Sequence, residues 1–463
     1  MLDIFTDLNI DNDKLHYKYV LLKNNQNLME ECSIIKDWVT GFIDRDNKII
    51  KEFQTTFHSS FWEFFLFAFL KEAELEVDFK HNRPDFIICA PNKFYIEAVV
   101  ANIKKGGRQE CERTIEDVLS MVEPYSLQEN FDENFIDSIL RYSSSFVFKS
   151  DKYKNYSSLN YFDRELPYVI ALSGYENINY GRNFYFAMLA LLYGEYFDNL
   201  NEIFLKKEKI LKPETKTEIQ IGLFLDEKFS HISAVIFSCT VTLGKLTSLA
   251  ISKNKVKNSL NSVLCIRHSM NVPHFNMHIV SPSSPENLSD GVFIFHNPRA
   301  KNPLPIECFN KTNAVNVFYN ADSREISFDG KNCPIVSRLN VPVPESGLKM
   351  VLPVIFESFN PHLLGIIAQV DAIEESYDSD GFDVKFVEIS DDPLDFVMTF
   401  TDEAIKTYNV KENNKYFFVF NIPQYLHIKT IEQFIIYKKF KRARFLIGER
   451  ELVLFKEVEG DFF

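Results

Sequence analysis

The stretch RPDFIICAPNKFYIEAVVAN, residues 83–102, constrains the fold more than any other part of the sequence. Two apolar runs, Phe86–Cys89 and Phe94–Ala101, flank a Pro-Asn turn, and this spacing predicts two strands of a sheet. Asp85 lies directly before the first run, and Glu97 lies inside the second. A carboxylate in an apolar strand is costly unless it is paired, hydrogen-bonded or bound to a metal. Both acids therefore need a chemical explanation.

The neighbouring sequence predicts the elements around this pair of strands. A serine N-cap at position 59 or 60 precedes an apolar run and predicts a buried helix to residue 72. Apolar patterns and turn signals further predict strands over 17–23, 75–79 and 166–174 and a helix over 134–149. The order from residue 60 onward is helix, three strands, helix, strand, which indicates an α/β fold.

A third unusual acid lies in the predicted helix, where Glu63 is the only polar residue among the ten of Phe61–Leu70. Any one of the three acids could lie at a sheet edge or pair with an arginine. Together, in this order of elements, Glu63, Asp85 and Glu97 favour one common site. Clustered acids repel each other and lose hydration on burial, so a divalent cation stabilises them. Oxygen ligands alone favour Mg²⁺ or Mn²⁺ over zinc.

These residues resemble the PD-(D/E)XK nuclease superfamily. The resemblance rests on Glu63, on RPDF at 83–86 and on YIEAVV at 95–100, and it covers residues 55–175. It implies a restriction-endonuclease-like αβββαβ core in which Asp85 and Glu97 bind Mg²⁺ or Mn²⁺ and Glu63 supports the metal. The metal would activate a water molecule to attack a phosphodiester bond.

The sequence departs from the family pattern at one position. Alternation along the predicted strand at 94–101 places Val99 on the same face as Glu97, and the family has a lysine at this position. A lysine there would help to deprotonate the water or stabilise the transition state, and valine can do neither. The predicted helix before the fourth strand offers Arg141 and Lys149 as replacements, eight residues apart and so near one face. The alternative is that both lie on a solvated basic face of this helix.

Composition limits the classes of protein to which this chain can belong. The net charge of −14 disfavours wholesale coating of nucleic acid but permits a local basic groove. Seven scattered cysteines without a CxxC pair indicate free thiols in a reducing compartment. No apolar run approaches the roughly 18 residues of a membrane-spanning helix, and no secretory signal is evident, so we expect a cytoplasmic protein without membrane contact.

Changes in the pattern of predicted helices and strands along the chain indicate four regions. We expect an N-terminal lead-in over 1–50, the nuclease-like domain over 51–205, a β-rich accessory extension packed on this core over 206–310, and a C-terminal α/β domain over 311–463. The last region is expected to bind a protein partner or to regulate the rest. An oligomer is compatible with this organisation.

Two main functions follow from the pattern. The first is a Mg²⁺-dependent endonuclease acting on nucleic acid, most directly DNA, in restriction, repair or anti-phage defence; fold analogy alone supports these settings. The alternative is a catalytically degenerate nuclease fold that binds nucleic acid or protein, for which Val99 is the best argument and Glu63 the best counter-argument. In a third variant, residues 311–463 recognise a partner or trigger and gate the nuclease.

Overall fold

The structure, a computed structural model, describes residues 2–458 except 115, 118–119, 125–127, 129, 180, 200–202, 214, 256–260, 270–272, 361–362, 378–380, 390–392 and 422–451. It forms two compact units. The first comprises Met1–Arg267 and His278–Val341, and the second comprises His268–Met277 and Pro342–Phe463. No helix of the described residues has both the length and the apolar character needed to cross a membrane.

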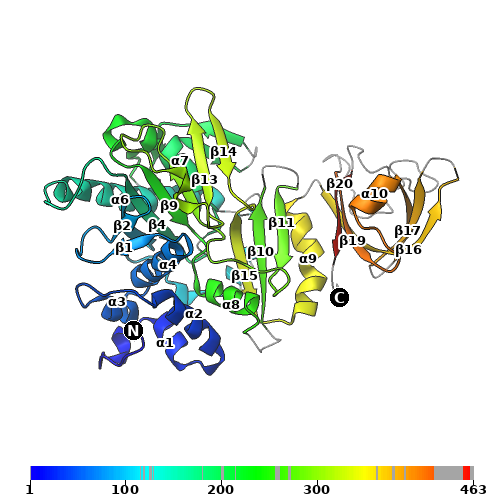
Figure 1. The fold of residues 1–463 in the computed structure, drawn as a ribbon, viewed down its shortest axis with the longest axis horizontal. Coiled ribbons are helices and arrows are strands. Elements are labelled where there is room, and N and C mark those ends of the chain that lie inside the picture. Colours follow the sequence, from blue (N-terminus) through cyan, green and yellow to red (C-terminus); the bar gives the residue numbers. More distant parts are fainter. Residues whose placement is uncertain are drawn as a thin grey trace. The chain divides into compact units, whose positions relative to one another are not determined.

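The first unit is mixed α/β and is built on an eight-stranded sheet (Figure 1). Its strands, in spatial order, are β1 (Glu76–Asp78), β2 (Phe86–Ala90), β3 (Phe94–Asn102), β4 (Tyr168–Tyr175), β9 (Ala234–Ser238), β12 (Phe293–His296), β13 (Val315–Asn320) and β14 (Glu325–Asp329). The central strands β3, β4 and β9 are parallel, and both β2 and β12 run antiparallel to the central strand beside them. The carboxyl ends of the three central strands therefore meet at one edge of the sheet.

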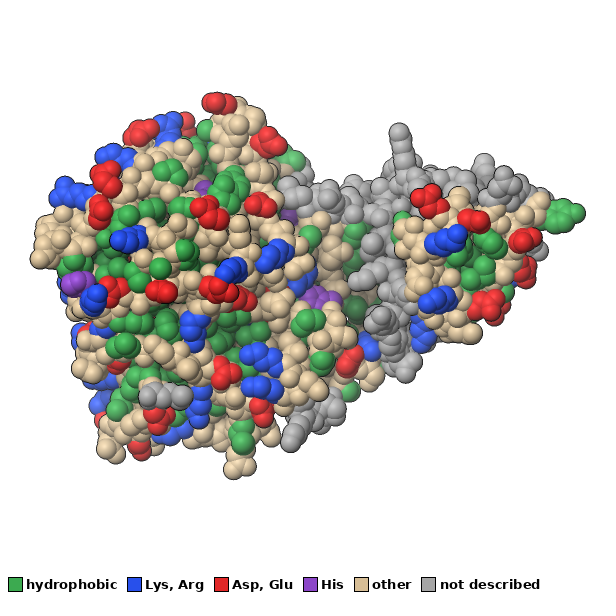
Figure 2. Space-filling view, viewed as in Figure 1, with side chains coloured by type: hydrophobic (Ala, Val, Ile, Leu, Met, Phe, Trp, Pro, Cys, Tyr) green, Lys and Arg blue, Asp and Glu red, His purple; other side chains and the backbone are tan. Residues whose placement is uncertain are grey.

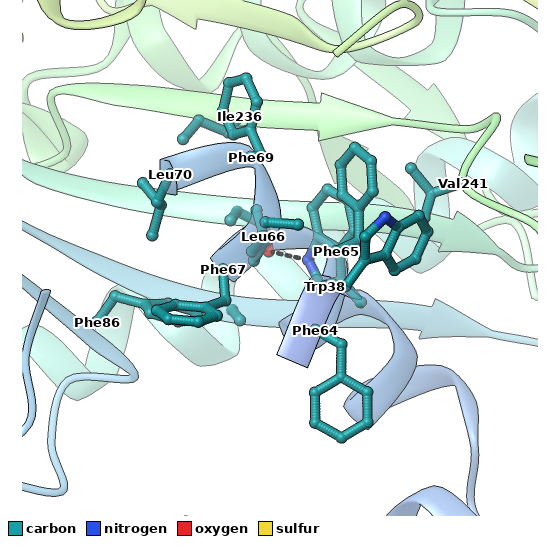
Figure 3. Packing of buried hydrophobic residues seen from close by; sticks show 14 of the residues in the cluster. Trp38, Phe64, Phe65, Leu66, Phe67, Phe69, Leu70, Phe86, Ile236 and Val241 are labelled. Carbon is teal, nitrogen blue, oxygen red and sulfur yellow. Dashed lines mark hydrogen bonds between the residues drawn. The ribbon is translucent and has the colours of Figure 1, made fainter. Parts of the chain in front are cut away.

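Helices cover both faces of this sheet. They are α1 (Tyr17–Asn24), α2 (Met29–Val39), α3 (Ile49–Thr55), α4 (His58–Glu72), α6 (Phe131–Tyr156), α7 (Phe186–Tyr193) and α8 (Leu243–Ser252). Alternation along the strands decides which helix each side chain meets. Phe94, Ile96 and Ala98 join the aromatic core around α4, which Figure 3 shows with Phe64, Phe65 and Phe69 of α4 close to Trp38 and Ile236.

The opposite face of the sheet packs against α6 and α7. Tyr142 of α6 lies edge-on to Phe237 of β9, with ring centroids 5.3 Å apart. Tyr185, which precedes α7, packs on Phe293 of β12 at 4.7 Å. Glu97 points to this second face, which places it under α6 and away from the aromatic core around α4.

The order of elements around the acids is the predicted one: α4, β1, β2, β3, α6 and β4 follow one another along the chain. The helix α6 continues to Tyr156, although the prediction ended it at residue 149. The strand predicted over 17–23 is wrong, because this segment is α1. The side chain of His16 caps α1 by accepting a hydrogen bond from the Lys18 N–H at 3.2 Å.

The structure draws the domain boundaries at other positions than the predicted 50, 205 and 310. The predicted accessory extension contributes β9 and β12 to the middle of the main sheet, because β9 pairs with β4 and β12 pairs with β9. Residues 311–341 continue this sheet as β13 and β14. The predicted lead-in supplies α1, α2 and part of α3, whose apolar residues join the core around α4.

Shorter strands complete the first unit: β5 (Glu195–Asp198) with β6 (Ile203–Lys206), β7 (Lys209–Leu211) with β8 (Glu218–Gln220), and β10 (Ser262–His268) with β15 (Ile335–Val341). The strand β11 spans Phe275–Ile279. The second unit has an antiparallel sheet in the order β18 (Asp395–Phe400), β17 (Phe382–Glu388), β16 (Leu363–Glu375), β19 (Lys415–Asn421) and β20 (Leu452–Val458). Its helices are α9 (Glu345–Phe359) and α10 (Asp402–Thr407).

Candidate functional site

Glu97 lies in the middle of β3 and is almost completely buried, with 1% of its side chain exposed. Its neighbours on β3, Ile96 and Ala98, point to the aromatic core on the other face. The pleat of the strand therefore directs the carboxylate of Glu97 towards α6. A buried carboxylate in this position requires partners that donate hydrogen bonds or carry positive charge.

Asp85 reaches the same place from the residue before β2. Its Oδ2 accepts a hydrogen bond of 2.8 Å from the backbone N–H of Ala98, the residue after Glu97. The Arg45 guanidinium fixes the Asp85 backbone by donating to its carbonyl oxygen at 2.6 Å. The side chain of Asp85 stays 27% exposed, so this acid connects the buried Glu97 with solvent. Burial and the charge of Glu97 raise the pKa of Asp85 above its usual value.

Lys149 of α6 brings a cation to both acids. Its Nζ lies 2.7 Å from Glu97 Oε1 and 3.4 Å from Asp85 Oδ2, and only 11% of its side chain is exposed. Burial would lower the pKa of Lys149, but the two carboxylates outweigh burial and raise it. The structure thus brings together Asp85, Glu97 and Lys149, three of the residues that the sequence singled out.

Two further residues of α6 contact Glu97, and the sequence analysis did not select them. Lys152 Nζ lies 3.2 Å from Glu97 Oε1, and the Tyr156 hydroxyl lies 3.2 Å from both carboxylate oxygens. Burial and the nearby carboxylates raise the pKa of Tyr156, so its hydroxyl remains a hydrogen-bond donor. The positions 149, 152 and 156 follow the i, i+3, i+7 spacing of one helix face. This spacing would have identified both residues if the predicted helix had continued past Lys149.

Glu63 approaches the site from α4. Its side chain is partly buried and makes no hydrogen bond or ion pair with any residue that the structure describes. Burial and the charge of Asp85 raise the pKa of Glu63 well above its ordinary value. Glu63 is thus an electrostatic neighbour of Asp85 and Lys149, and its carboxyl oxygens are available for a further ligand.

The structure does not bring Arg141 to the acids. Its Nε lies 3.8 Å from Asp137 Oδ1, one turn earlier on α6. Eight residues of helix separate Arg141 from Lys149, which is about 12 Å along the axis at a rise of about 1.5 Å per residue. A shared helix face was therefore not enough to predict which residue lies at the site. The position along the helix axis decides that Lys149, and not Arg141, reaches Glu97.

Four ionisable side chains are in contact at this place, Asp85, Glu97, Lys149 and Lys152, and Glu63 acts on them electrostatically. Three carboxylates and two ammonium groups give a formal charge of −1, or zero when Glu63 is protonated. Within the described part of the chain, no three His, Cys, Asp or Glu side chains are close enough together to hold a metal ion as they stand. Two acidic donors, Asp85 and Glu97, nevertheless converge on one cation, the Lys149 ammonium.

Comparisons of the chain with models of protein families, with characterised proteins and with solved structures find no match. The interpretation of this site therefore depends on its own geometry and charge.

Proposed function

We propose that this protein is a metal-dependent nuclease that hydrolyses phosphodiester bonds, most directly those of DNA, on a restriction-endonuclease-like core. One observation carries the proposal: Asp85 from the start of β2, Glu97 from β3 and Lys149 from the next long helix meet around a single ammonium group. Two carboxylates can hold a metal ion that activates water, and a lysine beside them can stabilise the charge that develops on a phosphodiester. The order of α4, β1, β2, β3, α6 and β4 agrees with the PD-(D/E)XK resemblance.

The donor set fits a hard divalent cation. Asp85 and Glu97 offer carboxylate oxygens that already converge on one positive charge, and oxygen donors suit Mg²⁺ or Mn²⁺. Both acids would hold the ion, and Glu63, which has no partner among the described residues, would support it. When bound, such an ion lowers the pKa of a water molecule and polarises a phosphoryl oxygen.

The lysines have a role in the same proposal. With a divalent cation present, three carboxylates, two ammonium groups and the ion sum to +1, which favours the approach of a phosphodiester anion. Lys149 would then donate hydrogen bonds to a phosphate oxygen in place of the lysine that Val99 replaces. The partly exposed Lys152, with 34% of its side chain accessible, would orient the same group from the solvent side.

The surface charge is consistent with recognition of nucleic acid through this local site and not through an extended basic surface. On the face of the first unit drawn in Figure 2, acidic and basic side chains are interspersed. Binding of nucleic acid would therefore depend on Lys149, Lys152 and the metal more than on general attraction, as the net charge of −14 also suggests.

One observation favours the second function, a degenerate nuclease fold that binds without cutting. Lys149, Lys152 and the Tyr156 hydroxyl already satisfy Glu97. With Glu63 protonated, the cluster is neutral without any metal. In this alternative the ammonium of Lys149 permanently occupies the position that the metal ion would take in a nuclease. The fold then serves as a binding module.

A cleavage assay distinguishes the two functions. Purified protein is incubated with supercoiled plasmid, linear duplex or single-stranded DNA in Mg²⁺, Mn²⁺ or EDTA. Asp85→Asn and Glu97→Gln are compared with Asp151→Asn, an exposed acid on the same helix as Lys149. Metal-dependent cutting that Asp85→Asn and Glu97→Gln abolish and Asp151→Asn retains supports the nuclease. Cutting that survives both site variants contradicts the site, and absence of cutting by folded protein on all three substrates favours the binding module.

A further inference from the structure

A second polar site lies in the first unit, at the carboxyl ends of the central strands. A cavity of ≈ 280 Å³ opens between α1, the segments after β4 and β9, the start of α8 and β15, all labelled in Figure 1. Tyr175, the last residue of β4, lies near this cavity, because its hydroxyl donates a hydrogen bond of 2.6 Å to the carbonyl of Val241, which precedes the lining residue Thr242. Tyr175 pairs with Asn102 of β3, five residues beyond Glu97, or about 17 Å at about 3.3 Å per residue. The cavity is thus distinct from the acid site.

Four basic side chains line this cavity: Lys18, Arg113, Arg182 and Arg338. No aspartate or glutamate is among its described lining residues. Glu110 accepts a hydrogen bond from Lys18 at 2.9 Å and Glu123 accepts one from Arg182 at 3.2 Å, and neither glutamate lines the cavity. The charged side chains of the lining are therefore all cationic, and the carboxylates that pair with two of them lie outside it.

A buried group of ions adds to this asymmetry. Arg338 and Lys245 both contact the single carboxylate of Glu286, with Lys245 Nζ at 2.6 Å and Arg338 Nε at 2.7 Å. At most 2% of any of these three side chains is exposed. Two cations on one carboxylate leave a positive charge next to the cavity, since Arg338 lines it. An anion in the cavity would offset this charge.

The helix α8 begins at the cavity and strengthens its preference for anions. Leu243 and Gly244, the first two residues of this ten-residue helix, line the cavity, and the N-cap residue Thr242 makes no side-chain capping hydrogen bond. First-turn N–H groups have no partner within a helix, and the helix dipole favours negative charge there. A Cβ at Gly244 would lie 3.3 Å from the Thr242 hydroxyl and 3.7 Å from the Arg338 side chain, so any other residue would crowd this wall of the cavity.

Arg182 contributes a further cation to the wall of the cavity. Its Nη1 donates to the Ser120 hydroxyl and its Nη2 to Glu123, each at 3.2 Å. Arg182 lines the cavity and its side chain stays 16% exposed. Its two Nη atoms carry four N–H groups, of which these contacts use two, so a bound anion with several oxygens is a suitable acceptor for the others.

We infer that this cavity is a binding site for the phosphate group of a small phosphorylated molecule. Guanidinium groups and helix-terminal N–H groups recognise phosphate oxygens in combination. Leu21, Met121 and Leu339 provide an apolar wall for the remainder of the ligand. The volume suits a compact ligand and excludes a duplex. This inference does not depend on the nuclease proposal.

Isothermal titration calorimetry of the full chain tests the site with inorganic phosphate, pyrophosphate, AMP and adenosine as probes. The variants are Arg113→Gln and Gly244→Ala, and the control is Arg108→Gln, an exposed arginine outside the cavity that pairs with Asp117. We expect at least one phosphate-bearing probe to bind and adenosine not to bind. Arg113→Gln should weaken this binding about tenfold or more, since a bond to a charged group is lost. Arg108→Gln should leave the affinity unchanged.

Binding of free phosphate alone would identify an inorganic anion site, and preference for AMP or pyrophosphate would identify a larger ligand; both outcomes retain the phosphate-group site. Gly244→Ala keeps the test valid if Arg113→Gln fails to fold, because alanine is well tolerated in a first helical turn. It should weaken binding by crowding the amide groups of α8. Absence of binding for all three phosphates at millimolar concentration would overturn the inference. Equal binding of adenosine and AMP, or equal weakening by Arg108→Gln, would also overturn it.

Discussion

Two of the clusters in the first unit in which lysine contacts glutamate differ in solvent access and in the sign of the excess charge. In the cluster of Lys245, Glu286 and Arg338, at most 2% of each side chain is exposed and cations outnumber the carboxylate. In the acid site, Asp85 and Lys152 remain 27% and 34% exposed, and carboxylates outnumber the lysines. The buried cluster stabilises the fold, and its surplus positive charge lies next to the cavity that Arg338 lines. The open cluster, with surplus carboxylates, can exchange its partners for metal or substrate.

Removal of Glu286 should produce the largest loss of stability. Glu286→Ala leaves Lys245 and Arg338 buried without their carboxylate, and breaking a buried ion pair costs about 3–5 kcal/mol. Urea unfolding followed by hydrogen exchange at residues of the main sheet would measure the effect in the first unit. The control Glu227→Ala removes an ion pair of a glutamate with 73% exposure. If both substitutions cost the same, the interpretation of the buried cluster as structural is wrong.

Loss of Lys149 should affect activity more than stability. Lys149→Met removes one partner of Glu97 but leaves Lys152 and Tyr156 in contact with it, so we expect a loss of about 1–3 kcal/mol. Under the nuclease proposal, cleavage should fall by about 10²–10³-fold, as for the loss of a hydrogen-bond donor that stabilises charge in the transition state. Lys154→Met, at an exposed position of the same helix, is the matched control. Cleavage kinetics with denaturation curves for both variants separate the two effects, and full activity of Lys149→Met would remove it from the site.

Lys152 should contribute less than Lys149, because its side chain is three times as exposed, at 34% against 11%. For Lys152→Gln we expect a stability change within about 1 kcal/mol, as for partly exposed ion pairs. Its effect on nucleic-acid binding should decrease as salt rises, since exposed charges are screened. Affinity for single-stranded and duplex DNA, measured at low and high salt, tests this order. An effect as large as that of Lys149→Met would contradict it.

Glu63→Gln should change stability in the opposite direction. A carboxyl group whose folded pKa is raised binds its proton more tightly in the folded state, so its contribution to stability falls as pH rises above the unfolded value near 4.5. The substitution should therefore be nearly neutral below pH 4.5 and stabilising at higher pH in EDTA. Melting temperatures across this range, with Glu165→Gln as an exposed control, measure the difference. A variant destabilised increasingly with rising pH would contradict the raised pKa of Glu63.

The sequence allowed the prediction of features that depend on local pattern. Asp85 and Glu97 stood out because each lies at or in an apolar strand, and Lys149 because the family resemblance allows a replacement lysine on the helix before the fourth strand. Lys152 and Tyr156 were missed because the predicted helix ended too early. Lys245, Glu286 and Arg338 come from distant segments, so no local spacing connects them. The extension of the main sheet through β9, β12 and β13 likewise depends on long-range pairing, which local propensity does not encode.

Residues 422–451 lie outside the described part of the chain, so the role of the C-terminal region in partner binding or regulation remains a prediction from sequence. The second unit has its own aromatic core, formed by Phe386, Phe396, Phe418 and neighbouring residues of its sheet. Separate expression of the two units would show whether the first unit alone has the activity proposed for the whole chain.

Direct measurement of Mn²⁺ binding is the most informative experiment, because it needs no knowledge of the substrate. Electron paramagnetic resonance of the purified protein during a Mn²⁺ titration counts the bound ions. We predict one site that is lost in Asp85→Asn and in Glu97→Gln and retained in Asp151→Asn, whose acid is exposed on α6. Absence of bound Mn²⁺ at millimolar concentration, or binding that both site variants leave unchanged, would contradict a metal-dependent site at Asp85 and Glu97.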